Sequence, residues 1–275
     1  MSQHKEQQGY FTFAQNTPDV DYLHLAYLQA LNIKATQRHS KFAVAVDAAT
    51  RAQVNETHLS VFDYIIDITH DFNSPDSSWR LANEWQVFWL TPFKETIKLE
   101  SDLLFTRSID HWWTAFRLRN VCLSTGCRNY RQELSTVRTY RRVFDNNHLP
   151  DVYNGLMYFR FSQEAQQFFT TARQIFENWA AVREQLKGCD EASPSTDLLY
   201  AITAQIVGRE TCTLPSLDFI NFVHMKPAIN GYDEDQNFSD VFNTEQDGNM
   251  IRINNINQYH PLHYYDKQWI LTNLK

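Results

Sequence analysis

The chain has 275 residues, 43% of them hydrophobic and 14% aromatic, which is enough apolar material for the core of one large domain. This composition excludes a disordered chain, and no apolar run is long enough to cross a bilayer. The polar N-terminus lacks the apolar segment of a signal peptide, and the four cysteines form no CxxC pair. We therefore expect a cytoplasmic protein with reduced thiols and no membrane partner. The net charge of −7 does not by itself indicate nucleic-acid binding.

Strands and helices alternate in the first quarter of the chain. Residues 1–8 form a polar tail that we expect to be flexible. Runs of β-forming residues and apolar residues at helical spacing then predict strands at 9–14, 41–46 and 62–67, with helices at 21–35 and 47–54. This order is typical of a parallel sheet with right-handed crossovers, so the predicted fold class is α/β.

The rest of the chain continues this pattern less regularly. We expect further helices at 79–89, 109–116, 163–185 and 195–207, and further strands at 95–105, 151–161 and 219–223. A turn is expected at Asn154-Gly155. Residues 230–275 are polar and aromatic with little periodicity, so we expect an irregular segment that wraps the sheet edge or covers the active site as a lid. No internal repeat is visible, and the prediction is a single domain over 1–275.

Two carboxylates interrupt, or end, the strand predicted at 95–105. Glu100 and Asp102 flank Ser101, and in an extended segment residues two apart project to the same side. Two such carboxylates repel each other unless a cation or a proton lies between them. A divalent ion that also binds substrate phosphates would relieve this repulsion, because such ions prefer oxygen ligands. The alternative is a pair of solvated loop acids.

Three further segments carry polar residues at the ends of predicted elements: Tyr153-Asn154-Gly155-Leu156-Met157, Pro194-Ser195-Thr196-Asp197, and His224-Met225-Lys226-Pro227. Ser195 suits the N-cap of the helix that follows, which leaves Asp197 free to meet a sugar hydroxyl or the acceptor. Ala14-Gln15-Asn16 end the first strand, where open α/β sheets bind nucleotides. Trp85 and Trp89 are expected in the core, whereas Trp79 is a candidate for the donor pocket.

The order and spacing of these segments resemble the GT-A nucleotide-sugar glycosyltransferases, in particular the family typified by glycogenin and bacterial lipopolysaccharide galactosyltransferases. The whole chain also resembles a group of glycosyltransferases encoded by T-even-like bacteriophages. That group includes enzymes that add a sugar, such as arabinose, to hydroxymethylated cytosine in DNA. The resemblance implies a GT-A (Rossmann-like) fold, with a mixed, mostly parallel sheet flanked by helices. A phage-encoded protein would act in the host cytoplasm.

The resemblance also implies roles for individual residues. The metal, Mn²⁺ or Mg²⁺, would be bound by Glu100, Asp102 and His224. The donor, a UDP-sugar, would be bound by Ala14, Gln15, Asn16, Trp79, Asn154 and Gly155. Asp197 and Lys226 would be the catalytic residues, with the lysine meeting the diphosphate. The sequence departs from the family pattern at three positions: Glu100 replaces an aspartate, Asn154 and Gly155 are contiguous, and Met225 replaces a glycine.

Arginine is concentrated in residues 107–142, which hold eight arginines and no lysine against only two acidic residues. Tyrosine and tryptophan are interleaved with them. Arginine together with aromatic rings suits phosphate binding and base stacking, although a solvated face is the alternative. The candidate acceptor-binding residues are Arg128, Arg131, Arg138, Arg141 and Arg142, with DNA as the expected partner.

The favoured interpretation is a metal-dependent glycosyltransferase that moves a sugar from a nucleoside-diphosphate sugar to an acceptor hydroxyl. A divalent ion and Lys226 would stabilise the negative charge that develops on the β-phosphate. The expected acceptor is 5-hydroxymethylcytosine in phage DNA, and a base in a duplex would first have to be flipped out. The alternatives are a glycan or lipid-precursor acceptor, which the net acidity favours, and a non-catalytic binding protein of the same fold. The sugar, the anomeric outcome and the oligomeric state stay open.

Overall fold

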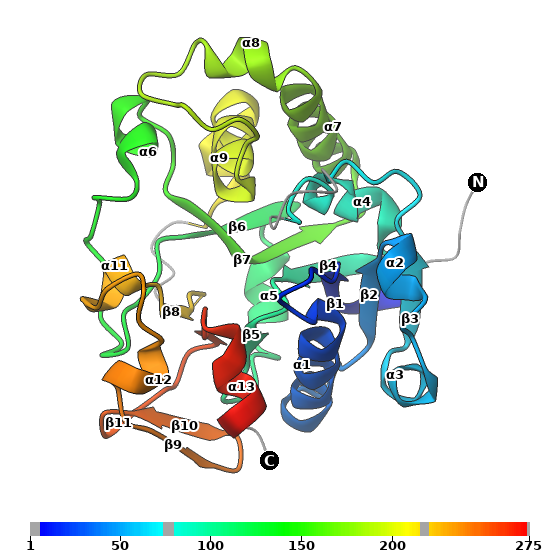
Figure 1. The fold of residues 1–275 in the computed structure, drawn as a ribbon. Helices are drawn as coiled ribbons and strands as arrows, with labels where there is room; N and C mark the ends of the chain where they lie inside the picture. The colour runs from blue at the N-terminus through cyan, green and yellow to red at the C-terminus, as the bar shows by residue number, and fades with distance from the viewer. Residues whose placement is uncertain (1–5, 74–79, 215–219, 274–275) are drawn as a thin grey trace.

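A mixed six-stranded sheet forms the centre of the computed structural model, which describes residues 6–73, 80–214 and 220–273 (Figure 1). Its strand order is β3-β2-β1-β4-β7-β6. The strands are β1 (Glu6–Ala14), β2 (Phe42–Val46), β3 (Tyr64–Asp67), β4 (Phe93–Leu99), β6 (Val121–Thr125) and β7 (Val152–Arg160). The first four are parallel, whereas β7 runs antiparallel to both β4 and β6. The prediction of a mixed, mostly parallel sheet is confirmed.

Helices cover both faces of this sheet and bury a separate apolar cluster on each. One face is covered by α1 (Tyr22–Thr36), α3 (Glu56–Val61) and α5 (Trp112–Phe116). The other is covered by α4 (Val87–Leu90), α7 (Gln163–Glu177) and α9 (Thr196–Val207). Short helical elements complete the described chain up to residue 214: α2 (Ala48–Arg51), η1 (Glu84–Gln86), α6 (Arg142–Asn146), α8 (Trp179–Arg183) and α10 (Arg209–Cys212).

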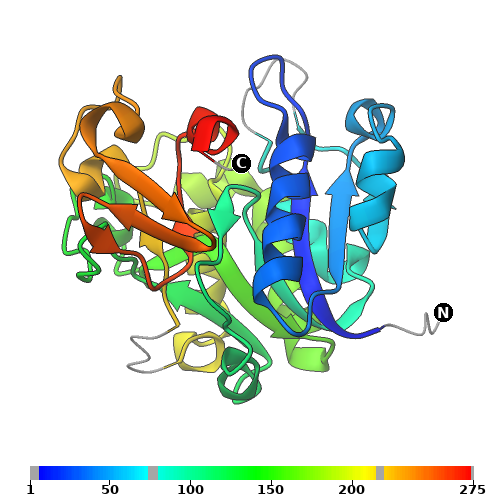
Figure 2. The ribbon, with the colours of Figure 1, turned by 90° about the horizontal axis from the view of Figure 1, so that it is seen from below.

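Residues 230–273 are more regular than the sequence suggests. They contain β9 (Thr244–Asp247), β10 (Met250–Ile253), β11 (Ile256–Asn257), β12 (Leu262–His263), α12 (Phe238–Val241) and α13 (Lys267–Asn273), after α11 (Pro227–Asn230). β12 pairs with two strands from other parts of the chain, β5 (Leu103–Leu104) and β8 (Val223–His224). The expectation of an irregular segment is therefore wrong, because strands this short leave no readable period. The orange and red C-terminal segment lies across the molecule from α3 (Figure 2).

Three local predictions need correction. Residues 6–8 belong to β1 and not to a flexible tail, since β1 pairs with β4 from Glu6 onward. The helix predicted at 79–89 is confined to η1 and α4, and the helix predicted at 163–185 is divided into α7 and α8 at Asn178. Strand β6 lies at the sheet edge and was not predicted, because its five residues stand within an arginine-rich stretch.

The predicted turn at Asn154-Gly155 is also wrong, because both residues lie inside β7. The register of β7 against β6 shifts at this point, so the chain bulges instead of turning. A Cβ at Gly155 would lie 2.8 Å from the Phe222 ring, so glycine permits a close approach here. The glycine therefore reflects packing within the sheet.

Candidate metal centre

The turn after β4 places two carboxylates at the carboxyl end of the parallel strands. β4 ends at Leu99, and the Leu103 N–H donates to the Glu100 carbonyl at 3.2 Å, which closes a turn before β5. This confirms the prediction that the strand is interrupted at Glu100-Ser101-Asp102. Because β7 is antiparallel to β4, its first residues reach the same edge, and the Glu100 N–H donates to the Gly155 carbonyl at 3.1 Å.

The strand register brings a histidine from the C-terminal segment against these carboxylates. β12 pairs with β5 so that His263 stands opposite Leu103, directly after Asp102. His263 Nε2 lies 2.9 Å from Asp102 Oδ2 and 3.2 Å from Glu100 Oε2. Lys267 Nζ, at the start of α13, also contacts Asp102 Oδ2. One potential ligand atom from each of Glu100, Asp102 and His263 lies within 4.8 Å of the others.

Charge and burial oppose each other in this cluster. Burial raises the pKa of Glu100, and this effect exceeds the opposing influence of His263. Burial acts in the same direction on Asp102, but His263 and Lys267 outweigh it and hold its pKa well below the usual range. Burial lowers the pKa of His263, but Asp102 and Glu100 outweigh this and raise it. His263 and Lys267 thus lie at the place where a cation or a proton would relieve the repulsion between the two carboxylates.

The donor set fits a divalent ion of the Mn²⁺ or Mg²⁺ type. A set of two carboxylates and one imidazole suits Mn²⁺ or Mg²⁺, whereas zinc is selected by thiolate-rich sets. The fit is also electrostatic, because an ion held by both carboxylates would relieve their mutual repulsion at the point where His263 Nε2 now contacts them. His263 Nδ1 is buried and has no hydrogen-bond partner in the described part of the chain, so the polar contacts of the ring are made through Nε2.

The predicted ligand His224 is not a member of this cluster. β8 pairs with β12 so that His224 stands opposite His263, and the two rings stack with centroids 4.4 Å apart. Burial lowers the pKa of His224, and the neighbouring His263 and Lys226 add to the effect. Lys226 Nζ lies 4.8 Å from the centre of the Tyr140 ring. The histidine and lysine at the carboxylates are therefore His263 and Lys267, and the assignment of His224 as a metal ligand stays a prediction.

The sequence does contain a signal for the second pair. His263-Tyr-Tyr-Asp-Lys267 also has a late histidine followed closely by a lysine. The first pair was preferred because it follows a predicted strand and precedes a proline. Only the pairing of β12 with β5, which lies about 160 residues earlier in the chain, distinguishes the two.

A buried network connects the carboxylates to Asn154 and Asp197. Asn154 Nδ2 donates to Glu100 Oε1 at 3.4 Å and also to Glu84. The Asn154 N–H donates to Asp197 Oδ1 at 2.7 Å. Glu84 is paired with Lys98 at 2.6 Å. The structure thus brings together the predicted residues Glu100, Asn154 and Asp197, and adds Glu84 and Lys98, which the sequence analysis missed.

The predicted donor residues at the end of β1 lie on the same edge of the sheet. Ala14 is fully buried as the last residue of β1. Gln15 Nε2 donates to Asp47 at 3.2 Å, and Asn16 Nδ2 donates to Asp21 at 3.0 Å. Both side chains are therefore committed to internal hydrogen bonds. The remaining donor candidate, Trp79, lies outside the described residues.

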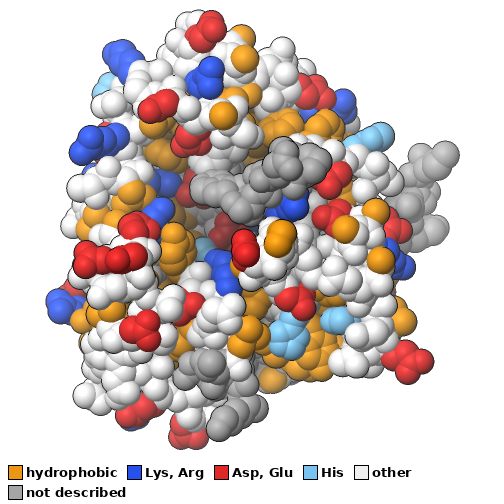
Figure 3. Space-filling model, viewed as in Figure 1, with side chains coloured by type: hydrophobic (Ala, Val, Ile, Leu, Met, Phe, Trp, Pro, Cys, Tyr) orange, Lys and Arg blue, Asp and Glu red, His pale blue; other side chains and the backbone are white. Residues whose placement is uncertain are grey.

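Acidic partners neutralise two of the five predicted acceptor-binding arginines. Arg141 is only 4% exposed and pairs with Asp151 and Asp197. Arg138 pairs with Asp145 and Asp151. The expectation that Arg141 faces DNA is wrong, because its side chain is buried. Arg138 is 36% exposed, but two carboxylates balance its charge. Figure 3 shows basic and acidic side chains interspersed over this face of the molecule.

The other three predicted acceptor-binding arginines, Arg128, Arg131 and Arg142, differ in how far they are exposed. Arg128 is partly buried, and its guanidinium donates to the Gln132 carbonyl at 2.5 Å. Arg131 and Arg142 are exposed. Within the described ranges, neither of these two forms an ion pair with an acidic side chain.

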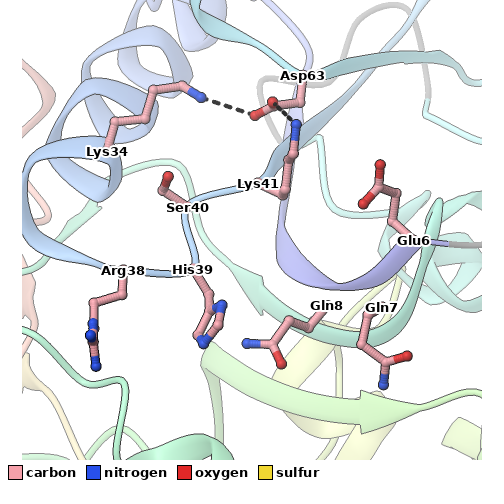
Figure 4. A pocket seen from close by; sticks show the side chains of 9 residues that line it. All are labelled: Glu6, Gln7, Gln8, Lys34, Arg38, His39, Ser40, Lys41 and Asp63. Atoms are coloured by element: carbon pink, nitrogen blue, oxygen red, sulfur yellow. Dashed lines mark hydrogen bonds and ion pairs between the residues drawn. The ribbon is translucent and has the colours of Figure 1, made fainter.

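A cavity of about 470 Å³ lies at the opposite, amino end of β1 and β2 (Figure 4). Lys34 and Lys41 line it, and both pair with Asp63 at 2.9 Å. It is remote from the carboxylates, which follow the carboxyl end of β4, and is not part of the candidate site. No helix in the described ranges is both long enough and apolar enough to cross a membrane.

Glycosyltransferases of known structure are similar to this chain in fold. Mouse xyloside xylosyltransferase 1, in its apo form, is 10% identical and superimposes with a TM-score of 0.50 over 86% of this chain and 92% of its own. This is the GT-A glycosyltransferase fold. The galactosyltransferase LgtC, in complex with donor and acceptor sugar analogues, is 14% identical with a TM-score of 0.46 over 71% and 69% of the two chains. No protein-family model and no curated protein matches the sequence.

Proposed function

We propose that this protein is a glycosyltransferase that moves a sugar from a nucleoside-diphosphate sugar to an acceptor hydroxyl with the help of Mn²⁺ or Mg²⁺. The observation that carries the proposal is the cluster of Glu100, Asp102 and His263 at the carboxyl end of β4, in a chain with the GT-A fold. In open α/β sheets, nucleotides bind at this end of the strands. Metal ligands at that edge suit the binding of a diphosphate, because a bound divalent ion would neutralise its negative charge.

Two positive groups would act on the diphosphate. When bound, the ion would be held by Glu100, Asp102 and His263 and would stabilise negative charge on the departing nucleoside diphosphate. Lys267 Nζ lies at Asp102, where it can pair with the same phosphate oxygens and stabilise the charge that develops on them. This proposal gives Lys267 the role that the sequence analysis assigns to Lys226.

The sugar and the nucleoside would occupy the adjoining parts of the sheet edge. We assign Asp197 and Asn154 to the sugar, because hydrogen bonds connect both to the network that includes Glu100. Each Asp197 oxygen accepts one hydrogen bond from the described residues, and the side chain is 28% exposed, so further lone pairs are open to a hydroxyl. The segment 14–16, whose side chains are already bonded internally, would contact a UDP-sugar through its backbone.

We consider two candidate acceptors, which transfer and binding assays distinguish. The net charge of −7 and the paired state of Arg138 and Arg141 favour a glycan hydroxyl. 5-Hydroxymethylcytosine in DNA is kept as the second candidate, because Arg131 and Arg142 are exposed and open to phosphate. Transfer to glycosides should be compared with transfer to DNA that contains hydroxymethylcytosine. Binding to duplex DNA should be followed across a salt series, and absence of binding at low salt would exclude the DNA acceptor.

The proposed activity is tested by donor hydrolysis. Incubation with Mn²⁺ and a series of UDP- and GDP-sugars should release nucleoside diphosphate slowly from one of them, and Asp102→Asn should abolish the release. Donor binding, seen as a rise in melting temperature without nucleotide release, would instead indicate a non-catalytic binding protein. If neither release nor binding is observed with any donor, the proposal is wrong.

A further inference from the structure

Arg141 is buried beside the candidate site between two aromatic rings. It is 4% exposed and immediately precedes α6. Its guanidinium carbon lies 3.6 Å from the centre of the Phe144 ring and 4.3 Å from the centre of the Tyr153 ring. A planar guanidinium between two ring faces is held in one orientation, as a lysine ammonium would not be.

Each nitrogen of this guanidinium has an acceptor. Nε donates to Asp151 Oδ1 at 2.9 Å, one terminal nitrogen donates to Asp197 Oδ2 at 2.8 Å, and the other donates to the Val152 carbonyl. Arg141 therefore ties three parts of the chain together: the start of β7, the first turn of α9 and the segment before α6. The three hydrogen bonds hold the buried guanidinium in one position, so Arg141 is not a solvated surface charge.

The contact with Asp197 connects Arg141 to the proposed sugar pocket. Asp197 Oδ2 is held by Arg141, and Oδ1 is held by the Asn154 N–H at 2.7 Å. Asn154 in turn donates to Glu100 at 3.4 Å. Because both oxygens are hydrogen-bonded, rotation of the Asp197 carboxylate is restricted, and this directs its unused lone pairs.

We propose that Arg141 is a positioning residue, which orients the Asp197 carboxylate toward the sugar of the donor. This inference rests on the proposed function and deepens it. Misplacing a group that positions the substrate by about 1 Å costs about 100-fold in rate. Loss of the Arg141 guanidinium should therefore slow turnover even though Arg141 does not itself contact the substrate.

The chain offers a matched control in Arg138. Like Arg141, Arg138 forms an ion pair with Asp151, at 2.6 Å. It also pairs with Asp145 at 2.5 Å, but its partners do not include Asp197. Its side chain is 36% exposed. Arg138→Ala thus removes an arginine–Asp151 pair from the same segment and leaves the Arg141–Asp197 contact in place.

The experiment compares Arg141→Ala, Arg141→Lys and Arg138→Ala with the unmodified protein. For each variant, kcat and KM for Mn²⁺-dependent donor hydrolysis without acceptor are measured, together with the melting temperature. Arg141→Lys keeps the charge, so it addresses the case in which Arg141→Ala does not fold. We expect kcat to fall about 100-fold in Arg141→Lys with a smaller change in KM, whereas Arg138→Ala stays within about 3-fold of the unmodified protein.

A chemical rescue separates positioning from general structural damage. Guanidinium chloride at low millimolar concentration should raise the kcat of Arg141→Ala at least about 5-fold, because the ion can enter between the two rings, whereas sodium chloride at the same concentration should not. Equal activity of Arg141→Lys and Arg138→Ala would overturn the positioning role while leaving the proposed function intact. An unmodified protein that hydrolyses no donor would refute the proposed function, and the positioning role with it.

Discussion

The buried pair of Lys98 and Glu84 gives a sharp test of the network beneath the site. Lys98 Nζ lies 2.6 Å from Glu84 Oε2, and the two side chains are 0% and 6% exposed. Removing one partner of a buried ion pair leaves an uncompensated charge and costs about 3–5 kcal/mol. Lys98→Met keeps much of the apolar stem of the lysine, so lost packing should contribute little. We expect Lys98→Met to lower the free energy of unfolding by about 3 kcal/mol or more.

Urea unfolding followed by tryptophan fluorescence measures this loss, since the chain has seven tryptophans. The control is the double variant Lys98→Met with Glu84→Gln, which removes both charges and keeps a hydrogen-bond acceptor for Asn154 Nδ2. It should recover more than half of the stability lost in the single variant. A single variant that loses less than about 1 kcal/mol would refute the reasoning, because a surface pair costs no more than that.

Three further predictions concern separate parts of the molecule. Gly155→Ala should destabilise the protein by about 1–3 kcal/mol in urea unfolding, because a Cβ would lie 2.8 Å from the Phe222 ring; an unchanged midpoint would contradict it. Burial raises the pKa of Asp63, but Lys41 and Lys34 outweigh this and hold it below 3.8. Asp63→Asn should therefore cost about 1 kcal/mol near neutral pH, and this difference should vanish as the pH falls below the carboxyl pKa; a pH-independent difference would contradict the ion pairs. Lys267→Ala should slow donor hydrolysis but strengthen Mn²⁺ binding without donor, measured by calorimetry, because it frees Asp102; weaker Mn²⁺ binding would contradict the contact.

The parts of the fold that could be predicted are those encoded locally. Helix α1 begins one residue after Asp21, whose side chain caps it by accepting from the His24 N–H, and such a cap is visible in sequence. The end of β4 was predicted from the break in apolar residues at Glu100. Strand β12, with two residues, was not predicted, because so short an element owes its existence to its partners β5 and β8.

In the candidate site, too, only the features encoded by neighbouring residues could be predicted. The carboxylates Glu100 and Asp102 are neighbours in sequence, so their proximity could be predicted. The choice between His224 and His263 could not, because each is the last residue of a two-residue strand and only the β5–β12 register brings one of them to Asp102. Counting arginines likewise predicted a positive surface. Sequence composition does not reveal that Asp151 and Asp197 lie on Arg141 in the folded chain.

The central claim is that a divalent ion is held by Glu100, Asp102 and His263, and one comparison of two histidine variants tests it most directly. Mn²⁺ affinity is measured by calorimetry on His263→Gln and on His224→Phe, which keeps an aromatic ring against His263. We predict that Mn²⁺ binding falls at least about 10-fold in His263→Gln and stays within about 3-fold of the unmodified protein in His224→Phe. Unchanged Mn²⁺ binding in His263→Gln, with loss of binding in His224→Phe, would contradict the account.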